Sequence, residues 1–196
     1  MIKELSHPQE SQIQDKFFRE FLKDRDSIRV KNWSGWSYKK GRKHKERTRF
    51  YREFDIAKFA RKSLPYGSYD LKLTGYEVKG CRKDRREKML EPPFGEGLDQ
   101  ALALLQQGAD FSYVIYPEPT NVEIKSALKE MCDRYAPNIG IIYVNRDLSW
   151  YQTYREAKQN INVNRDRTRD MLTSLITGGN YSEISELPLW AKRHQY

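Results

Sequence analysis

The chain has 196 residues, with 36 Lys and Arg against 27 Asp and Glu, which gives a formal net charge of +9. Its length suits one ordinary domain, and an aromatic share of 13% argues against a wholly disordered chain. No stretch approaches the roughly 20 apolar residues of a membrane helix, and the N-terminus lacks the apolar core of a signal peptide. We therefore expect a soluble, cytoplasmic protein without membrane contact.

The first half of the chain predicts a helix followed by strands. Ser6 and Gln9 form a capping-box pattern, and apolar residues then recur at helical spacing. Aromatic and branched residues, separated by a Pro-Tyr-Gly turn, mark the strands. In chain order, the predicted elements are a helix at 8 to 24 and strands at 27 to 32, 48 to 61 and 69 to 79, with a turn at 64 to 68.

The second half alternates helices with apolar strands. Thr120 and Glu123 form another capping-box pattern, and Gly108 and the pair Gly178-Gly179 are helix stops. The predicted elements are helices at 95 to 107, 121 to 135 and 165 to 177, with strands at 111 to 117 and 139 to 145.

This order of elements predicts an α/β fold with a mixed central β-sheet flanked by helices. We place the core domain at 1 to 150. Residues 151 to 196 are expected to form a C-terminal helical extension packed on the same domain.

The positive charge is concentrated in two runs. Residues 31 to 52 carry nine Lys or Arg against one acid, Glu46, and residues 79 to 88 carry six bases against two acids. Such clusters, interleaved with aromatic rings, are typical of a nucleic-acid surface. The alternative is a solvated loop whose aromatic residues belong to the core. The predicted nucleic-acid contacts are Trp33, Trp36, Lys39, Lys40, Arg42, Lys43, Lys45, Arg47, Arg82 and Lys83.

The cysteines and histidines exclude several kinds of site. Cys81 and Cys132 are far apart and form no C-x-x-C pair, so neither a disulfide framework nor a thiolate metal site is indicated. The three histidines are equally scattered, which argues against a zinc site or a Ser-His-Asp triad. Any chemistry must therefore come from carboxylates, lysines and amides.

A triplet in the predicted strand 69 to 79 carries that chemistry. Residues two apart in a strand face the same way, so Glu77 and Lys79 share one face. In the preceding strand, Asp55 faces one side while Phe54 and Ile56 face the other. If the hairpin is centred on residue 66, Asp55 and Glu77 stand opposite each other, about 5 Å apart.

Two carboxylates this close repel each other unless a cation or a proton lies between them. Mg²⁺ prefers such oxygen ligands, lowers the pKa of a bound water and neutralises charge on a phosphate. Lys79 would orient or deprotonate the attacking water and stabilise the transition state. The arrangement is thus suited to phosphodiester hydrolysis.

These residues resemble the PD-(D/E)xK nuclease superfamily. The likeness is strongest at Asp55 and, after 21 residues, at Glu77-Val78-Lys79, and it covers roughly residues 8 to 145. No Pro precedes Asp55, a departure that is common in this loosely patterned family. The resemblance implies a restriction-endonuclease-like fold in which Asp55, Glu77 and the Val78 carbonyl bind the metal and Lys79 assists the water. It also assigns Glu10, on the first helix, and Gln100, on the helix after the lysine strand, to the catalytic site.

Other interpretations of single residues remain open at this point. Glu77 and Lys79 are alternatively a surface pair on an edge strand. Asp70 would replace Asp55 if the chain turned tightly at Thr74-Gly75, although Thr-Gly is a poor two-residue turn. Glu96 is a weaker candidate for the site, and Arg165, Arg167 and Arg169 are expected to form an exposed helical face, with DNA contact as the minor reading.

The functional expectation is a metal-dependent endodeoxyribonuclease that hydrolyses phosphodiester bonds in DNA with Mg²⁺, for which Mn²⁺ would substitute. The competing hypothesis is a catalytically silent nucleic-acid-binding accessory protein with a nuclease-like fold. RNA is the alternative substrate. A homodimer would be favoured if both strands of a duplex are cut.

Overall fold

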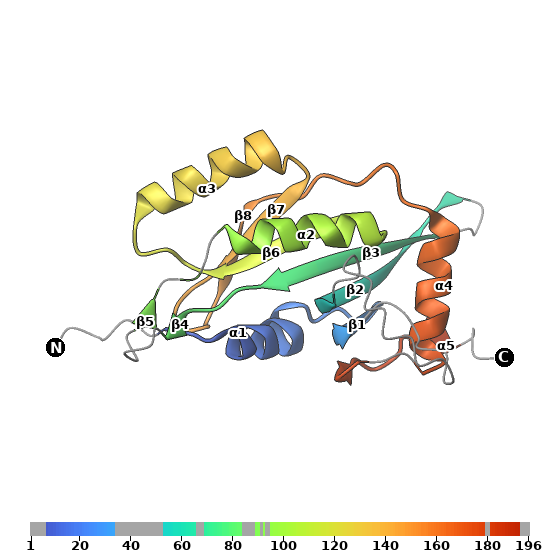
Figure 1. The fold of residues 1–196 in the computed structure, drawn as a ribbon. Coiled ribbons are helices and arrows are strands. Elements are labelled where there is room, and N and C mark those ends of the chain that lie inside the picture. Colours follow the sequence, from blue (N-terminus) through green and yellow to red (C-terminus); the bar gives the residue numbers. More distant parts are fainter. Residues whose placement is uncertain are drawn as a thin grey trace, which may run out of the picture.

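The computed structural model describes residues 7–33, 53–65, 69–83, 89–90, 92, 95–178 and 181–192. They form an α/β fold with helices on both faces of a seven-stranded mixed sheet, as expected (Figure 1). The strands are β1 (Ser27–Trp33), β2 (Phe54–Ser63), β3 (Tyr69–Val78), β6 (Phe111–Pro117), β7 (Ile139–Val144), β8 (Tyr151–Arg155) and β9 (Glu183–Ile184).

The strands lie in the order β8-β7-β6-β3-β2-β1-β9. Strand β3 is central: it pairs antiparallel with β2 on one side and parallel with β6 on the other. A separate two-stranded sheet consists of β4 (Arg82–Lys83) and β5 (Met89–Leu90), directly after the end of β3. The residues that directly follow β3 therefore lie beside the middle strand of the main sheet.

Two apolar cores lie on opposite faces of the sheet. The first face carries α2, α3 and α4, and the second carries α1 with its π-helical continuation η1 (Figure 1). The helices are α1 (Glu10–Lys16), η1 (Phe17–Phe21), α2 (Glu96–Gln107), α3 (Val122–Tyr135), α4 (Arg165–Ile176) and the short α5 (Leu189–Lys192).

Most predicted elements are confirmed, with four differences. The first helix begins at Glu10 and its N-cap is Gln9, not the predicted Ser6. The first helix changes to a π-helical turn at Phe17. The helix predicted from a Thr120–Glu123 capping box is capped by Asn121 instead, whose side chain accepts the Glu123 N–H at 2.8 Å. The segment after residue 150 contributes two strands, β8 and β9, to the main sheet besides its helices. In the described ranges, no helix combines the length and apolar character needed to cross a bilayer.

Candidate active site

The register of the β2–β3 hairpin is the one that the sequence predicts. Ile56 pairs with Tyr76 and Ala57 pairs with Gly75, which centres the hairpin on residue 66. Asp55 lies just before the first of these pairs, and its Oδ2 accepts a hydrogen bond of 2.7 Å from the Val78 backbone N–H. The Asp55 carboxylate is therefore tied to the strand end that carries Glu77 and Lys79.

A paired irregularity in β1 and β2 shapes this end of the sheet. Asn32 has a φ of 50°, in the left-handed region that Asn tolerates better than most residues. The buried Gln14 amide donates to Asn32 Oδ1 at 2.6 Å and to the Asp55 carbonyl at 2.8 Å. The Gln14 side chain thus links Asn32, where the backbone is irregular, to the backbone of Asp55.

The irregularity changes which face of the sheet each side chain meets. Phe54 belongs to the α2 core together with Ala57, three residues away, while Ile56 belongs to the α1 core. The expectation that Phe54 and Ile56 share one face was wrong, because regular alternation is interrupted at Asp55.

Glu77 and Lys79 form a buried ion pair rather than a surface pair. Each is only 5% exposed, and Lys79 Nζ lies 2.6 Å from Glu77 Oε1. Strand β3 lies at the centre of the sheet, and this position explains the burial of the pair. The alternative prediction, a surface pair on an edge strand, is therefore wrong. Two ionisable groups in this position cost free energy unless they are paired, which makes them candidates for function.

The site raises the pKa of both carboxyl groups, Asp55 and Glu77, so their charged forms are disfavoured. Burial raises the pKa of Glu77 to about 7, and the nearby charge of Asp55 adds to the effect. Burial also raises the pKa of Asp55 to about 6, against the opposing effects of the Val78 N–H bond and the Lys79 charge. A cation placed between these oxygens would remove the repulsion.

Glu10 lies within electrostatic range of both carboxylates, since its charge raises the pKa of Asp55 and of Glu77. Gly80 makes this placement feasible: a Cβ at that position would lie 2.0 Å from the Glu10 backbone nitrogen. The Cys81 N–H donates to the Pro8 carbonyl at 3.0 Å and fixes the same contact. The start of α1 is thus packed directly against the strand end, as the prediction for Glu10 requires.

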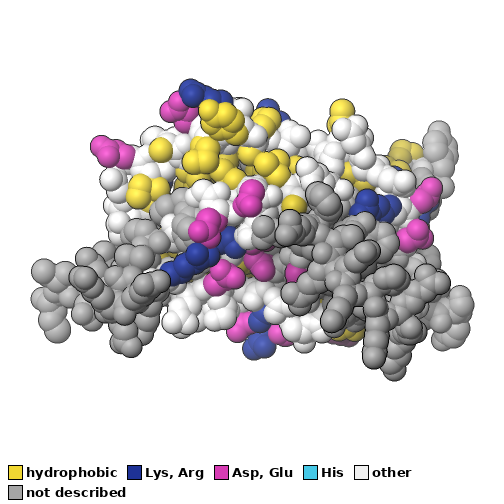
Figure 2. Space-filling model, in the orientation of Figure 1, with side chains coloured by type: hydrophobic (Ala, Val, Ile, Leu, Met, Phe, Trp, Pro, Cys, Tyr) yellow, Lys and Arg dark blue, Asp and Glu magenta, His cyan; other side chains and the backbone are white. Residues whose placement is uncertain are grey.

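The start of α2 closes the site from the first face of the sheet. A Cβ at Gly97 would lie 3.2 Å from Lys79 Cγ and 2.9 Å from the Tyr116 hydroxyl, so the helix approaches both side chains closely. Gln100 follows one turn later on the same side of the helix. Its Oε1 is buried and has no hydrogen-bond partner among the described residues. Figure 2 shows acidic and basic side chains side by side in the middle of this face.

Sequence reasoning missed Tyr116, Gly80 and Gly97. Tyr116 lies within an apolar strand, where nothing distinguishes its hydroxyl from other core tyrosines. Burial is the main cause that raises the pKa of Tyr116 above its ordinary value, and the charges of Glu77 and Asp99 contribute. The glycines had a visible signal, because each flanks the lysine strand or begins the next helix, where close backbone approach favours glycine.

The rival residues lie elsewhere. Asp70 is at the opposite end of β3, where it forms ion pairs with Lys72 at 2.8 Å and Arg165 at 3.3 Å, so it does not replace Asp55. Arg165 also binds the buried Asp110 at 2.6 Å, which corrects the expectation of a wholly exposed arginine face on α4. Glu96 is exposed and pairs with Arg82 at 2.9 Å.

The predicted nucleic-acid contacts are only partly within the described residues. Trp33 was wrongly included: it is fully buried, with ring centroids 5.4 Å from both Phe54 and Phe59. Arg82 is exposed, and Lys83 is placed in β4 by its backbone. Trp36, Lys39, Lys40, Arg42, Lys43, Lys45 and Arg47 lie outside the described residues.

The available ligands suit a hard cation that takes only a few of its ligands from the protein. In the part of the chain that the structure describes, no three His, Cys, Asp or Glu side chains are grouped to hold a metal ion. Asp55 and Glu77 provide two carboxylates, and Mg²⁺ is commonly held by one or two, with water completing its shell.

No protein-family model, curated protein or solved structure matches this chain. The fold and the site therefore define its class by themselves. It is an α/β protein with a seven-stranded mixed sheet, in which the partly buried Asp55 and the buried Glu77 and Lys79 converge at the end of the central strand.

Proposed function

We propose that the chain is a Mg²⁺-dependent endonuclease that hydrolyses phosphodiester bonds in DNA and has a restriction-endonuclease-like fold. The observation that carries the proposal is the convergence of Asp55, Glu77 and Lys79 at one end of the central strand. The electrostatic effect of Asp55 on Glu77, together with burial, leaves two carboxyl groups that a divalent cation would stabilise in their charged forms.

Asp55, Glu77 and the Val78 carbonyl would hold the cation. When bound, Mg²⁺ supplies positive charge for the scissile phosphate and lowers the pKa of a coordinated water. Binding would draw Glu77 oxygens away from exclusive pairing with Lys79, whose ammonium now lies 2.6 Å away. Lys79 would then be available to orient the water and to stabilise negative charge on the phosphate.

Glu10 and Gln100 would act from the two helices that flank the strand end. The Glu10 carboxylate adds negative charge beside Asp55 and Glu77, which increases the attraction for a cation. The unpartnered Gln100 oxygen is available as a hydrogen-bond acceptor for a water or for a substrate group. Glu10 is exposed and Gln100 is neutral, so the two helices supply polar groups without adding a buried charge to the site.

The test is cleavage by purified wild type, Asp55→Asn and Lys79→Met proteins. Substrates would be linear, nicked, flapped and four-way DNA, with matched RNA, in Mg²⁺, Mn²⁺ or EDTA. Methionine at 79 keeps most of the lysine volume and removes its charge. Lys129→Met is the matched control, because Lys129 is exposed on α3.

We expect both site variants to cut DNA at least about 100-fold more slowly than wild type, the size of effect typical for loss of one preorganised electrostatic group. Lys129→Met should cut normally, and EDTA should abolish turnover. DNA binding without cleavage under every metal condition would instead support the catalytically silent accessory protein. Unchanged cleavage by Asp55→Asn and Lys79→Met would refute the site.

A further inference from the structure

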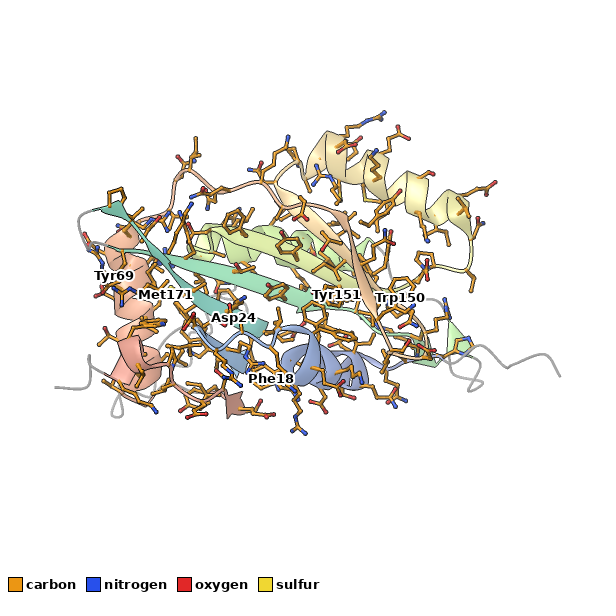
Figure 3. All side chains as sticks on the ribbon, turned by 180° about the vertical axis from the view of Figure 1, so that it is seen from behind. Phe18, Asp24, Tyr69, Trp150, Tyr151 and Met171 are labelled. Carbon is orange, nitrogen blue, oxygen red and sulfur yellow. The ribbon has the colours of Figure 1, made fainter. Side chains whose placement is uncertain are left out.

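A pocket lies on the opposite face of the sheet from Glu77. Its volume is about 330 Å³, at the small end of the range for ligand pockets. The pocket lies between η1 and strands β3, β6 and β8, and Figure 3 shows Tyr151 on this side of the sheet. Six aromatic side chains line it: Phe17, Phe21, Tyr76, Phe111, Tyr113 and Tyr151.

Five of these rings form one connected cluster, in which Phe17 contacts Tyr76 with ring centroids 5.6 Å apart. Tyr76 and Tyr113 are stacked with centroids 5.7 Å apart and an interplanar angle of 19°. Tyr151 packs against Phe21 at 4.9 Å and against Phe17 at 5.3 Å. Tyr151 nevertheless remains 42% exposed, so part of its ring is open to a partner. The pocket thus offers aromatic surface that its own neighbours do not cover.

One tyrosine hydroxyl in the pocket has no hydrogen-bond partner among the described residues. Tyr76 is only 7% exposed, yet its hydroxyl makes no hydrogen bond to any residue that the structure describes. Tyr113, by contrast, donates to Glu156 at 2.9 Å. The Tyr76 hydroxyl can therefore donate a hydrogen bond to a ligand atom that reaches it.

Positive charge lies at the edge of the pocket. Lys58 and Lys23 both line it, and Lys58 is paired with Asp24 at 3.0 Å. Lys23 has no ion pair within the described ranges, so its ammonium is available to an anion. Lys23 also lines a larger neighbouring opening of about 1050 Å³, where Arg25, Arg29 and Arg61 are found. The same opening is also lined by Lys192 and by the acidic residues Asp24, Asp26 and Glu186, so the aromatic surface adjoins a groove of mixed charge with an excess of basic side chains.

We propose that this pocket binds one unstacked nucleobase, with the attached phosphate at Lys23. A base matches both features, since it presents a flat π-surface to the tyrosine rings and hydrogen-bond acceptors to the Tyr76 hydroxyl. The base could belong to a free mononucleotide or to an unpaired position of a strand, and the same chemistry recognises both.

The nucleobase site is separate from the proposed cleavage site. Tyr76 and Glu77 are adjacent in β3 and face opposite sides of the sheet, in the α1 core and toward α2 respectively. Binding can therefore be measured in EDTA, where the proposed cleavage cannot occur. Failure of either proposal leaves the other intact.

The experiment measures binding of a fluorescein-labelled twelve-residue oligothymidylate by anisotropy, beside an abasic strand of equal length. Titration of thymidine monophosphate distinguishes a mononucleotide site from a strand site. The variants are Tyr151→Ala and Tyr76→Phe, and the matched control is Tyr135→Ala, since Tyr135 is 70% exposed on α3. A strand with one 2-aminopurine reports stacking directly, because an aromatic neighbour quenches its fluorescence.

We expect Tyr151→Ala to weaken oligothymidylate binding by about fivefold or more, the loss typical for one base–aromatic stack. It should also reduce the quenching of 2-aminopurine, whereas Tyr135→Ala should change neither. Tyr76→Phe keeps the ring and should weaken thymidylate binding while leaving the abasic strand unaffected. Equal binding of the thymidylate and abasic strands, or equal effects of Tyr151→Ala and Tyr135→Ala, would overturn the proposal.

Discussion

Asp55→Asn should stabilise the protein while it removes the proposed metal ligand. Asparagine keeps an oxygen that can accept the Val78 N–H, which now bonds Asp55 Oδ2 at 2.7 Å. It removes a negative charge that raises the pKa of Glu77. The pKa of Asp55 is higher in the folded chain than in the unfolded chain, so the folded state keeps this proton up to a higher pH. Ionisation of Asp55 therefore lowers the free energy of unfolding as the pH rises.

The size of this effect follows from the pKa difference. A rise from 3.8 to about 6 corresponds to at most about 3 kcal/mol in the free energy of unfolding. The Asp55 side chain is only partly buried, so solvent screening reduces this to about 1–2 kcal/mol. For a chain of this length, that difference corresponds to a Tm increase of about 2–8 °C. The penalty in wild type accumulates between a pH of about 4 and about 6 and is nearly constant above about 7.

Thermal denaturation of wild type and Asp55→Asn in EDTA, followed by circular dichroism from pH 4 to pH 8, measures the difference. The variant should match wild type near pH 4 and exceed its Tm by about 2–8 °C at pH 8. Mg²⁺ should then raise the Tm of wild type more than that of the variant, because a ligand stabilises the form that binds it. A Tm difference that is independent of pH, or a less stable variant at pH 8, would refute the electrostatic reasoning.

Two further predictions concern packing. Trp33→Ala should lower the free energy of unfolding by about 3–5 kcal/mol, because the indole is fully buried, whereas Trp150→Ala at a 43% exposed position should cost less than about 1 kcal/mol; urea denaturation of both measures this. Equal costs would contradict the core position of Trp33. Gly80→Ala should cost at least about 2 kcal/mol, since its Cβ would meet Glu10 backbone at 2.0 Å. Gly95→Ala is the control, because a Cβ there would meet no described atom within 4 Å beyond its chain neighbours, and a tolerated Gly80→Ala would disprove the close approach.

The hairpin that carries the site could be predicted because its determinants are local. The Pro-Tyr-Gly turn and the alternation of apolar residues place the centre at residue 66, and the observed pairs agree. Glu77 and Lys79 then share a face for geometric reasons alone. Burial of this pair could not be predicted from the hairpin alone, because it depends on the neighbouring strand β6 and on the helices that cover the end of β3.

The two edge strands, β8 and β9, could not be predicted in the same way. Strand β8 has the polar sequence Tyr-Gln-Thr-Tyr-Arg, which lacks the apolar run of β6 or β7, and it is held by pairing with β7. Strand β9 has only two residues and depends on pairing with β1, far away in the sequence. Such elements have little local preference, so tertiary contacts decide them.

Trp33 shows why composition misled the functional interpretation at one position. It lies near the start of the basic run 31 to 52, and a tryptophan in such a run is typical of a nucleic-acid surface. The positive φ of Asn32 reverses the side-chain alternation, so Trp33 joins Val30 in the same core instead of facing away from it. That conformation is held by Gln14, which also holds the backbone of Asp55. The same long-range contact thus buries the tryptophan and fixes the aspartate, and no pattern within either strand specifies it.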